Sequence, residues 1–496
     1  MKDFENENEK QTKNSITQEE EVLKSEKSLI QRSKILSLEK KDAFIEKPER
    51  WFNLVAFCLC LFANGFQWLG FSLISCQFSY HYEKSLWKIN LFSTLFFIIY
   101  PFASIPEAIF VEKYSIRKGL FVASLFTFLG AFFKLFAYKD TTLSVCYIGQ
   151  ILPALFRPML LNSPGKIASN WFGQNKRTLI CSICCLSDTL GILIGYLWSC
   201  IFVKDKDSDE IYKEQIFRHF LSEFILIFLF CIPALFIKEN QENLPSLSRD
   251  NSKLKVINIW ESFKLLMGKK SFIFLLISFF FIAGYYFFIG TIFYNLLFLY
   301  DIGRKKSNII FCVSFIAGII SSIIISIILD KNKKFKFCLI NLSILALIFQ
   351  ALLTFLFEWL DPEEVNIFKI GLVLYILIHS IVIPFYTIGM NYVSEIAYPV
   401  DESISWGIII SFTQICGLIS FYLLDNILND VEKEIWLTNV IILAFFFIGF
   451  IFIFFSNEQL IRGEIEYKGG QKGDNDKIRK NPNILPVEFK QNEKIQ

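Results

Sequence analysis

The chain has 496 residues, of which 53% are hydrophobic, and its mean hydropathy is +0.45. Its formal net charge is only +3, which is too small to indicate a nucleic-acid partner. The apolar residues gather in blocks of about 20, the length that crosses the hydrocarbon of a bilayer. The composition therefore excludes an ordinary soluble protein and indicates one that is embedded in a lipid bilayer.

Twelve apolar blocks follow one another along the chain. Each is long enough to cross a bilayer as a helix, which satisfies its own backbone hydrogen bonds. We expect an all-α membrane protein with spans at residues 52–79, 88–111, 118–137, 143–163, 178–203, 218–237, 272–299, 307–329, 336–357, 366–393, 403–424 and 435–455.

A polar loop at residues 238–270 divides the spans into two sets of six. This layout is typical of the major facilitator fold, with six-helix halves at 50–237 and 271–455. Residues 1–49 and 456–496 are polar and charged, which predicts disordered tails. Lys and Arg are more frequent in the loops on the side of both tails, so we expect both termini in the cytoplasm. A plasma membrane and an endomembrane fit equally well.

The first span carries three polar side chains near its middle. Asn64, Gln67 and Trp68 lie within the apolar run RWFNLVAFCLCLFANGFQWLGFSLIS. Their spacing places them on one face of a helix. Polar groups at this depth cost free energy unless they meet a partner or water, so this face is expected to line a substrate path. A Trp ring also binds cations; the alternative for Trp68 is an interfacial position.

The loops after the second and eighth spans are similar to each other. They read VEKYSIRKG and LDKNKKFKF, each with an acid followed by basic residues. This pattern is a degenerate form of a motif that pairs an acid with basic residues across a cytoplasmic seam. It predicts structural or gating roles for Glu112, Arg117 and Asp330. The alternative is an ordinary basic loop.

The fourth span contains prolines and an arginine. Pro153, Pro158 and Pro164 are expected to kink or end the helix. Arg157 lies inside the span, where a charge is costly unless it is paired or faces water. It is expected to bind an anionic group or to form a structural ion pair.

The fifth span, CSICCLSDTLGILIGYLW, carries Asp188 near its centre. Three roles are open for this carboxylate: counter-ion for a cationic substrate, proton carrier, or partner of Arg157. Gly191 and Gly195 form a GxxxG pair, which permits close helix packing.

The seventh span is rich in aromatic residues. Tyr285, Tyr286, Phe287, Tyr294 and Asn295 mark a broken helix there. Composition alone favours ordinary packing for these rings; the alternative is that, facing the first span, they complete an aromatic cage with Trp68.

Polar residues also interrupt the tenth and eleventh spans. His379, Asn391 and Gln414 lie at depth, and Glu395 closes the tenth span at the inner face. We interpret the isolated His379 as a hydrogen-bonded structural residue and Glu395 as a structural or gating residue.

Three of these segments resemble the feline leukaemia virus subgroup C receptor (FLVCR-related) family of the major facilitator superfamily. Residues 50–75 carry RW…NGFQW…S-x-I-S, residues 149–195 carry GQ…P-x-KIASNWFG…CSI…LG-x-x-IG, and residues 395–417 carry EIAYP…S-x-x-G…QI-x-G. The motifs cover about a quarter of the chain and occur in the family's order. The resemblance implies transport of choline and ethanolamine, with an older attribution of haem export.

The resemblance also implies a cation site made by a Trp of the first span, a Tyr of the seventh, and glutamines of the fifth and eleventh. Two of these positions are retained here, as Trp68 and Gln414.

The other two positions differ. The glutamine of the fifth span falls on Thr189, beside Asp188, and the tyrosine of the seventh falls on Phe287, beside Tyr286. Phenylalanine keeps the aromatic face and loses the hydroxyl group, while Asp188 adds a negative charge that favours a cation.

The sequence therefore predicts a monomeric transporter in a lipid bilayer that moves a choline- or ethanolamine-like organic cation by alternating access. The alternative is a haem exporter, which would use histidines or basic residues and is ranked lower. A receptor or sensor would need a long soluble domain. No phosphate loop, catalytic triad or metal-ligand spacing is present in the sequence, so we expect no enzyme activity and no cofactor.

Overall fold

The computed structural model describes residues 48–137, 143–203, 209–238, 259–298, 300, 302–359, 367–429, 435–458, 460 and 462. Most of the two predicted tails and much of the predicted central loop lie outside these residues. The described part is helical and contains no strand, and twelve of its helices are long and apolar enough to cross a membrane. The predicted twelve-span, all-α architecture is confirmed.

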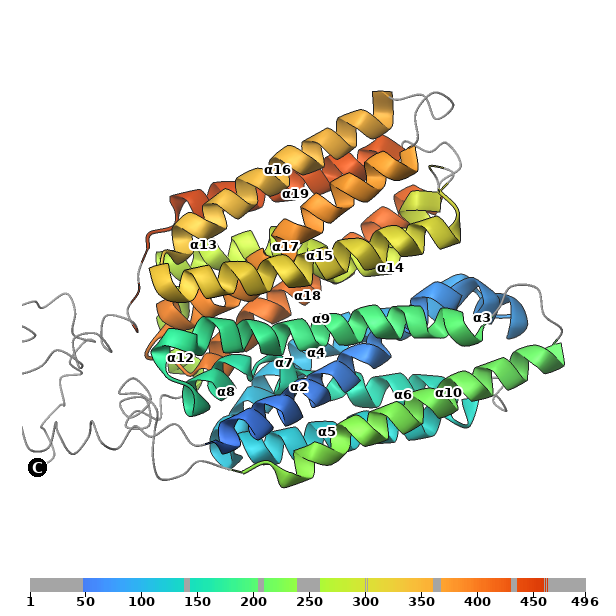
Figure 1. Ribbon diagram of the computed structural model, residues 1–496, viewed down its shortest axis with the longest axis horizontal. Coiled ribbons are helices and arrows are strands. Elements are labelled where there is room, and N and C mark those ends of the chain that lie inside the picture. The colour runs from blue at the N-terminus through green and yellow to red at the C-terminus, as the bar shows by residue number, and fades with distance from the viewer. Residues whose placement is uncertain are drawn as a thin grey trace, which may run out of the picture.

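The helices form two halves that lie side by side (Figure 1). The first half comprises α2 (Glu49–Trp68), α3 (Ser75–His81), α4 (Leu86–Tyr114), α5 (Ile116–Lys134), α6 (Ser144–Leu155), α7 (Arg157–Leu161), α8 (Pro164–Trp171), α9 (Arg177–Phe202) and α10 (Asp209–Cys231). The second comprises α13 (Lys270–Ser278), α14 (Gly284–Phe298), α15 (Arg304–Asn332), α16 (Phe335–Trp359), α17 (Ile367–Ala397), α18 (Glu402–Asn429) and α19 (Ile435–Phe455). A short helix, α12 (Ile259–Met267), lies within the predicted central loop and precedes the second half.

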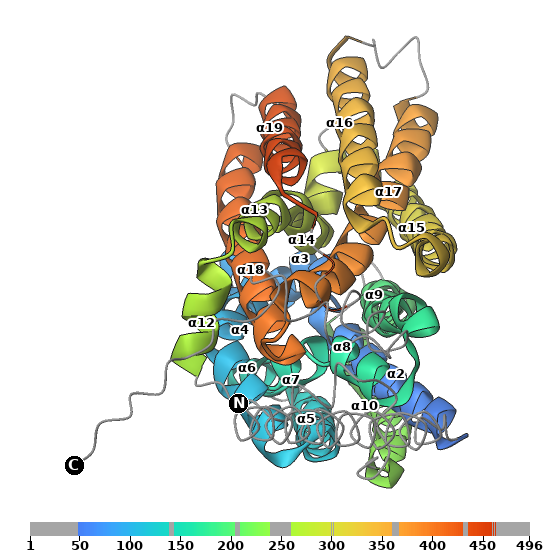
Figure 2. The ribbon, with the colours of Figure 1, turned by 90° about the vertical axis from the view of Figure 1, so that its left-hand side faces the viewer.

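Two helix pairs form the boundary between the halves. α4 packs against α18, and α9 packs against α15. Figure 2 views the bundle from the end at which α2 and α9 begin, which we call the inner end because the sequence predicts it to face the cytoplasm. Residues from both halves therefore meet along the centre of the bundle, where the polar residues of the spans lie.

Three spans are discontinuous near this centre. α2 ends at Trp68, and a 3₁₀ turn at Ser72–Ile74 separates it from α3, so the first span is not the single helix that was predicted. The fourth span breaks between α6 and α7, where proline removes backbone donors as the sequence predicted. A π-helical turn at Phe279–Ala283 interrupts the seventh span. Such breaks are common at transporter binding sites, because they leave backbone groups and side chains free to meet a solute.

The two glycines of the fifth span bring α9 against α2. A Cβ atom added at Gly191 would collide with the carbonyl oxygen of Phe62, and one added at Gly195 would collide with that of Phe66. The obstacle is backbone, which cannot rotate away as a side chain can. The GxxxG pair thus performs the close-packing role that its spacing predicts.

We expect Gly195→Ala to lower the free energy of unfolding by about 2–3 kcal/mol, because the added methyl group overpacks the contact. Thermal unfolding of the purified protein in detergent measures this change. Gly303→Ala is the matched control, since a Cβ atom there meets nothing within 4 Å. Equal effects of the two substitutions would contradict a special role for the α2–α9 contact.

Candidate functional site

A buried ion pair joins two spans of the first half near the bundle centre. The Nη2 atom of Arg157, at the start of α7, lies 2.7 Å from Oδ2 of Asp188 on α9. The two side chains are only 1% and 3% exposed. The Nη1 atom of Arg157 also donates to Oδ1 of Asn64, at 2.8 Å. The charges of Arg157 and Asp188 thus offset each other where neither is hydrated.

Gly65 explains how Asp188 comes so close to α2. A Cβ atom at position 65 would lie 2.7 Å from Oδ1 of Asp188. Any larger residue at position 65 would therefore collide with both the carboxylate and the backbone carbonyl oxygen of Asp188. Oδ1 of Asp188 has no hydrogen-bond partner among the described residues.

The guanidinium group of Arg157 also stacks over the indole ring of Trp68. Its Cζ atom lies 5.0 Å from the ring centroid, within the range of a cation–π interaction. The indole N–H donates to the carbonyl oxygen of Ser93 at 3.0 Å, which fixes the orientation of the ring. Phe97 packs edge-on against the same ring, with centroids 5.4 Å apart. The face of Trp68 therefore already holds a cation, which belongs to the protein itself.

Aromatic residues of the second half complete the surroundings of Trp68. The ring of Phe287, on α14, lies 6.0 Å from that of Trp68. The neighbouring Tyr286 has its hydroxyl group 2.9 Å from that of Thr189 on α9, so a hydrogen bond crosses between the halves. Tyr286 also stacks on Tyr386 of α17, with centroids 5.1 Å apart and planes inclined by 13°.

The remaining predicted polar residues differ in their hydrogen-bond partners. Nε2 of Gln67 donates to the carbonyl oxygen of Thr127 on α5, at 2.8 Å, so its amide points into the first half. Asn64 likewise donates to Oγ1 of Thr127, at 3.2 Å, besides accepting from Arg157. Gln414, on α18, is 1% exposed, and its side-chain oxygen has no partner among the described residues. The structure thus brings Asn64, Trp68 and Asp188 together through Arg157.

At the inner end, Asp330 ties the halves together. Its two carboxylate oxygens, on α15, accept the backbone N–H groups of Thr178 and Leu179 at 3.0 and 2.9 Å. These amides belong to the first turn of α9, where the helix dipole favours a negative charge. Glu112 and Arg117, the counterparts in the first half, are exposed at the same end of the bundle.

Further polar contacts cross the same boundary. Lys166 of α8 pairs with Asp401 at 3.2 Å, and Ser169 donates to Oε2 of Glu402 at 3.0 Å. The other oxygen of Glu402 pairs with Arg462, which follows the last span. Glu395 is half-buried nearby. We call the cross-half contacts of Asp330, Asp401 and Glu402 the inner gate.

Several buried charged residues were not singled out from the sequence. Lys134 of α5 pairs with Glu223 of α10 at 2.8 Å, and His219 lies 3.8 Å from the same carboxylate. Glu107 of α4 accepts the backbone N–H of Met159 at 2.8 Å. The sequence does contain a signal for these residues, because an ionisable residue within an apolar block indicates a buried polar contact.

Residues 55–420 match the Major Facilitator Superfamily. The chain belongs to this superfamily. Its fold is also similar to the crystal structure of a Major Facilitator Superfamily transporter, FucP, in the outward conformation, with a TM-score of 0.58, 14% identity, and coverage of 84% of this chain and 100% of that one.

Curated relatives have similar sequences across most of their length. The choline/ethanolamine transporter flvcr2a of Danio rerio is 24% identical over 448 residues, covering 88% of this chain and 93% of the relative. The choline/ethanolamine transporter FLVCR1 of Mus musculus is 24% identical over 429 residues, covering 82% and 74%. The predicted resemblance to the FLVCR-related family is therefore confirmed. The chain is a multi-pass membrane transporter of this superfamily, and its relatives do not favour the haem alternative.

Proposed function

We propose that this transporter carries a small organic cation of the choline or ethanolamine type by alternating access. The observation that carries the proposal is the guanidinium group of Arg157 over the ring of Trp68, at 5.0 Å. A site that accommodates a delocalised cation on an indole face suits an ammonium group of similar size. The similarity to choline/ethanolamine transporters supports the same substrate class.

In this proposal the substrate takes the place of Arg157. Oδ2 of Asp188 supplies the negative charge that the ammonium group would meet once Arg157 withdraws from Trp68. Phe287 and Tyr286 close the site from the second half, so a bound cation would contact both halves. The halves would then rock around the occupied site, opening first one end and then the other.

The histidines give no support to a porphyrin substrate. His379 is fully buried, and its Nδ1 atom lies 2.9 Å from the carbonyl oxygen of Tyr375 in its own helix. His219 is buried beside Glu223. Among the described residues, neither histidine ring contacts Trp68, Arg157 or Asp188. An organic cation therefore suits this site better than haem does.

We further propose that the protein acts as a monomer, has both termini in the cytoplasm, and catalyses no chemical reaction. A plasma membrane or an endomembrane is the proposed location, and no nucleic-acid partner is expected. The inner gate supports this orientation, because the loops that flank it carry the Lys331–Lys336 cluster.

Uptake of radiolabelled choline into proteoliposomes tests this function. We expect saturable uptake that unlabelled ethanolamine inhibits and haem does not. Asp188→Asn should reduce uptake at least about tenfold, because Arg157 would keep its charge beside Trp68 and repel the substrate. Glu214→Gln, which removes a carboxylate whose side chain is 58% exposed, is the matched control. Haem transport without choline uptake would refute the proposal.

A further inference from the structure

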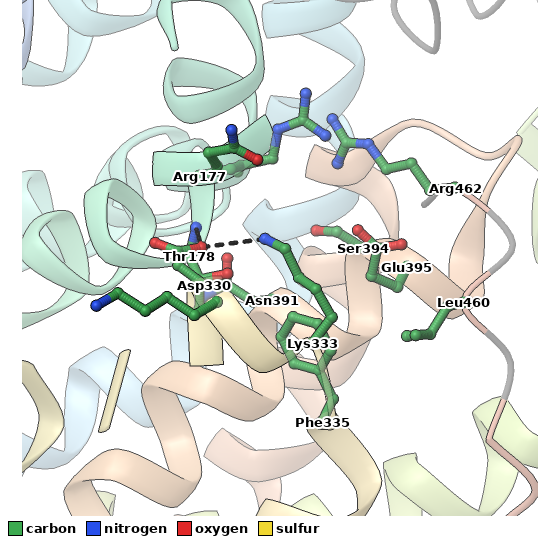
Figure 3. A pocket seen from close by; sticks show the side chains of 13 residues that line it. Arg177, Thr178, Asp330, Lys333, Phe335, Asn391, Ser394, Glu395, Leu460 and Arg462 are labelled. Carbon is green, nitrogen blue, oxygen red and sulfur yellow. Dashed lines mark hydrogen bonds and ion pairs between the residues drawn. The ribbon is translucent and has the colours of Figure 1, made fainter. Parts of the chain in front are cut away.

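A cavity of about 440 Å³ opens at the inner end, between the two halves (Figure 3). Its walls come from both sides of the boundary: Arg177 and Thr178 belong to α9, whereas Asp330, Lys331 and Ser394 belong to the second half. Leu460 and Arg462, after the last span, close a third side. The volume lies within the range of about 300–1,000 Å³ that is typical of small-molecule sites.

The cavity is distinct from the Trp68 cluster, and its lining is basic. Four cationic side chains line it, against two carboxylates: Arg177, Lys331, Lys333 and Arg462 against Asp330 and Glu395. Asp330 is already committed, because its two oxygens accept two backbone N–H groups and Oδ1 also lies 3.3 Å from Nζ of Lys333. Arg462 is likewise paired with Glu402, which lies beside the cavity. Four cationic side chains therefore meet three carboxylates in all, and one positive charge is in excess.

Two arginines from different halves line the cavity. Arg177 and Arg462 are only 6% and 4% exposed, and Figure 3 shows both guanidinium groups along the same edge of the cavity. A guanidinium group binds the oxygens of phosphate in a bidentate manner, which an ammonium group cannot do. The hydroxyl group of Ser394 accepts the indole N–H of Trp406 at 2.9 Å, so its own O–H can donate into the cavity.

We propose that this cavity binds a phosphate-bearing anion from the inner side of the membrane and that the bound anion keeps the inner gate closed. The anion is either a soluble phosphate or the headgroup of an anionic lipid, since both present the same oxygens. Alternating access separates the inner ends of the halves, and the cavity would come apart with them. A ligand that binds only the assembled cavity must shift the equilibrium toward the closed gate.

Binding is tested with the purified full chain in nanodiscs of neutral lipid, titrated calorimetrically with inorganic phosphate. We expect saturable binding that Arg177→Gln weakens about tenfold or more, because a charged hydrogen bond is lost. Lys331→Gln should weaken it a few-fold. Lys334→Gln is the matched control, because Lys334 is an exposed lysine in the same loop that does not line the cavity.

Nanodiscs that contain phosphatidic acid separate the two sources. If a lipid headgroup fills the cavity, the chain in these discs is stabilised against heat and no longer binds added phosphate. If soluble phosphate is the ligand, the titration is the same in both kinds of disc. Absence of both phosphate binding and lipid stabilisation would overturn the proposal, as would an equal loss of affinity in Lys331→Gln and Lys334→Gln.

The effect on the gate is read from Cys181, which lies buried on α9 one turn above Arg177. Saturating inorganic phosphate, or phosphatidic acid in the nanodisc where the lipid fills the cavity, should slow maleimide labelling of Cys181 several-fold in the wild type, as measured by peptide mass spectrometry. In Arg177→Gln the same concentration should leave the labelling rate unchanged. Labelling of the wild type that does not respond to ligand would refute the coupling between the cavity and the inner gate.

Discussion

Replacing Trp68 with alanine is expected to lower the initial rate of choline uptake at low concentration by about 30-fold or more. A cation–π interaction in a desolvated site contributes about 2 kcal/mol, and each 1.4 kcal/mol corresponds to about a tenfold change. Trp68→Phe keeps an aromatic face with a weaker affinity for cations and should retain part of the activity. Uptake into proteoliposomes measures all three proteins.

Trp87→Ala provides the control for this comparison. Trp87 is 64% exposed, with Lys88 over its ring at 5.6 Å, so it shares the chemistry of Trp68 but lies on the surface. Its replacement should leave uptake unchanged. Equal uptake by Trp68→Ala and the wild type would place the substrate elsewhere in the protein.

Replacing Arg157 with alanine is expected to destabilise the folded protein by about 3–5 kcal/mol, because it leaves the Asp188 carboxylate buried without its partner. The double variant Arg157→Met, Asp188→Asn removes both charges and should recover most of this loss. Thermal unfolding in detergent of the wild type, Arg157→Met, Asp188→Asn and the double variant, analysed as a double-mutant cycle, gives the coupling energy between the two residues.

The exposed pair of Arg218 and Glu214 serves as the control. Their side chains are 65% and 58% exposed, and water screens their attraction. Breaking this pair should change the unfolding temperature little. The account would be contradicted if Arg157→Ala lowered the unfolding temperature as little as breaking the exposed pair. It would also be contradicted if the double variant were less stable than Arg157→Ala alone, since the buried ion pair would then not stabilise this part of the bundle.

The twelve spans followed from the sequence because hydropathy alone specifies them. The break in the fourth span was predictable as well, since Pro153 and Pro158 remove backbone donors. The break after Trp68 was not, because no proline lies in that span. Gly70 lies directly after the end of the helix, and the Trp68 ring contacts Ser93 and Phe97 of α4 at this point.

The candidate site was only partly predictable. The sequence placed Arg157 and Asp188 in neighbouring spans and left their pairing as one of several possibilities, since spacing along the chain cannot show which helices touch. Helical spacing also put Gln67 on the face of Trp68, but its amide finds Thr127 within the first half. Tyr386 was missed altogether, because its stacking on Tyr286 depends on how α17 packs against α14.

The two similar loops illustrate the same limit. Both carry an acid before a basic cluster, yet Asp330 accepts the amides at the start of α9 while Glu112 lies exposed. The motif predicts the position of an acidic residue in each loop, but not which groups that residue contacts. The packing of α15 against α9 brings Asp330 to these amides, which the motif alone does not predict.

The most direct test of the proposed site is a structure of the protein with choline bound. We expect the choline nitrogen within about 6 Å of the Trp68 ring centroid, with the Arg157 guanidinium group displaced from that ring. Choline bound elsewhere, with Arg157 still 5.0 Å above Trp68, would contradict the proposed exchange of one cation for the other.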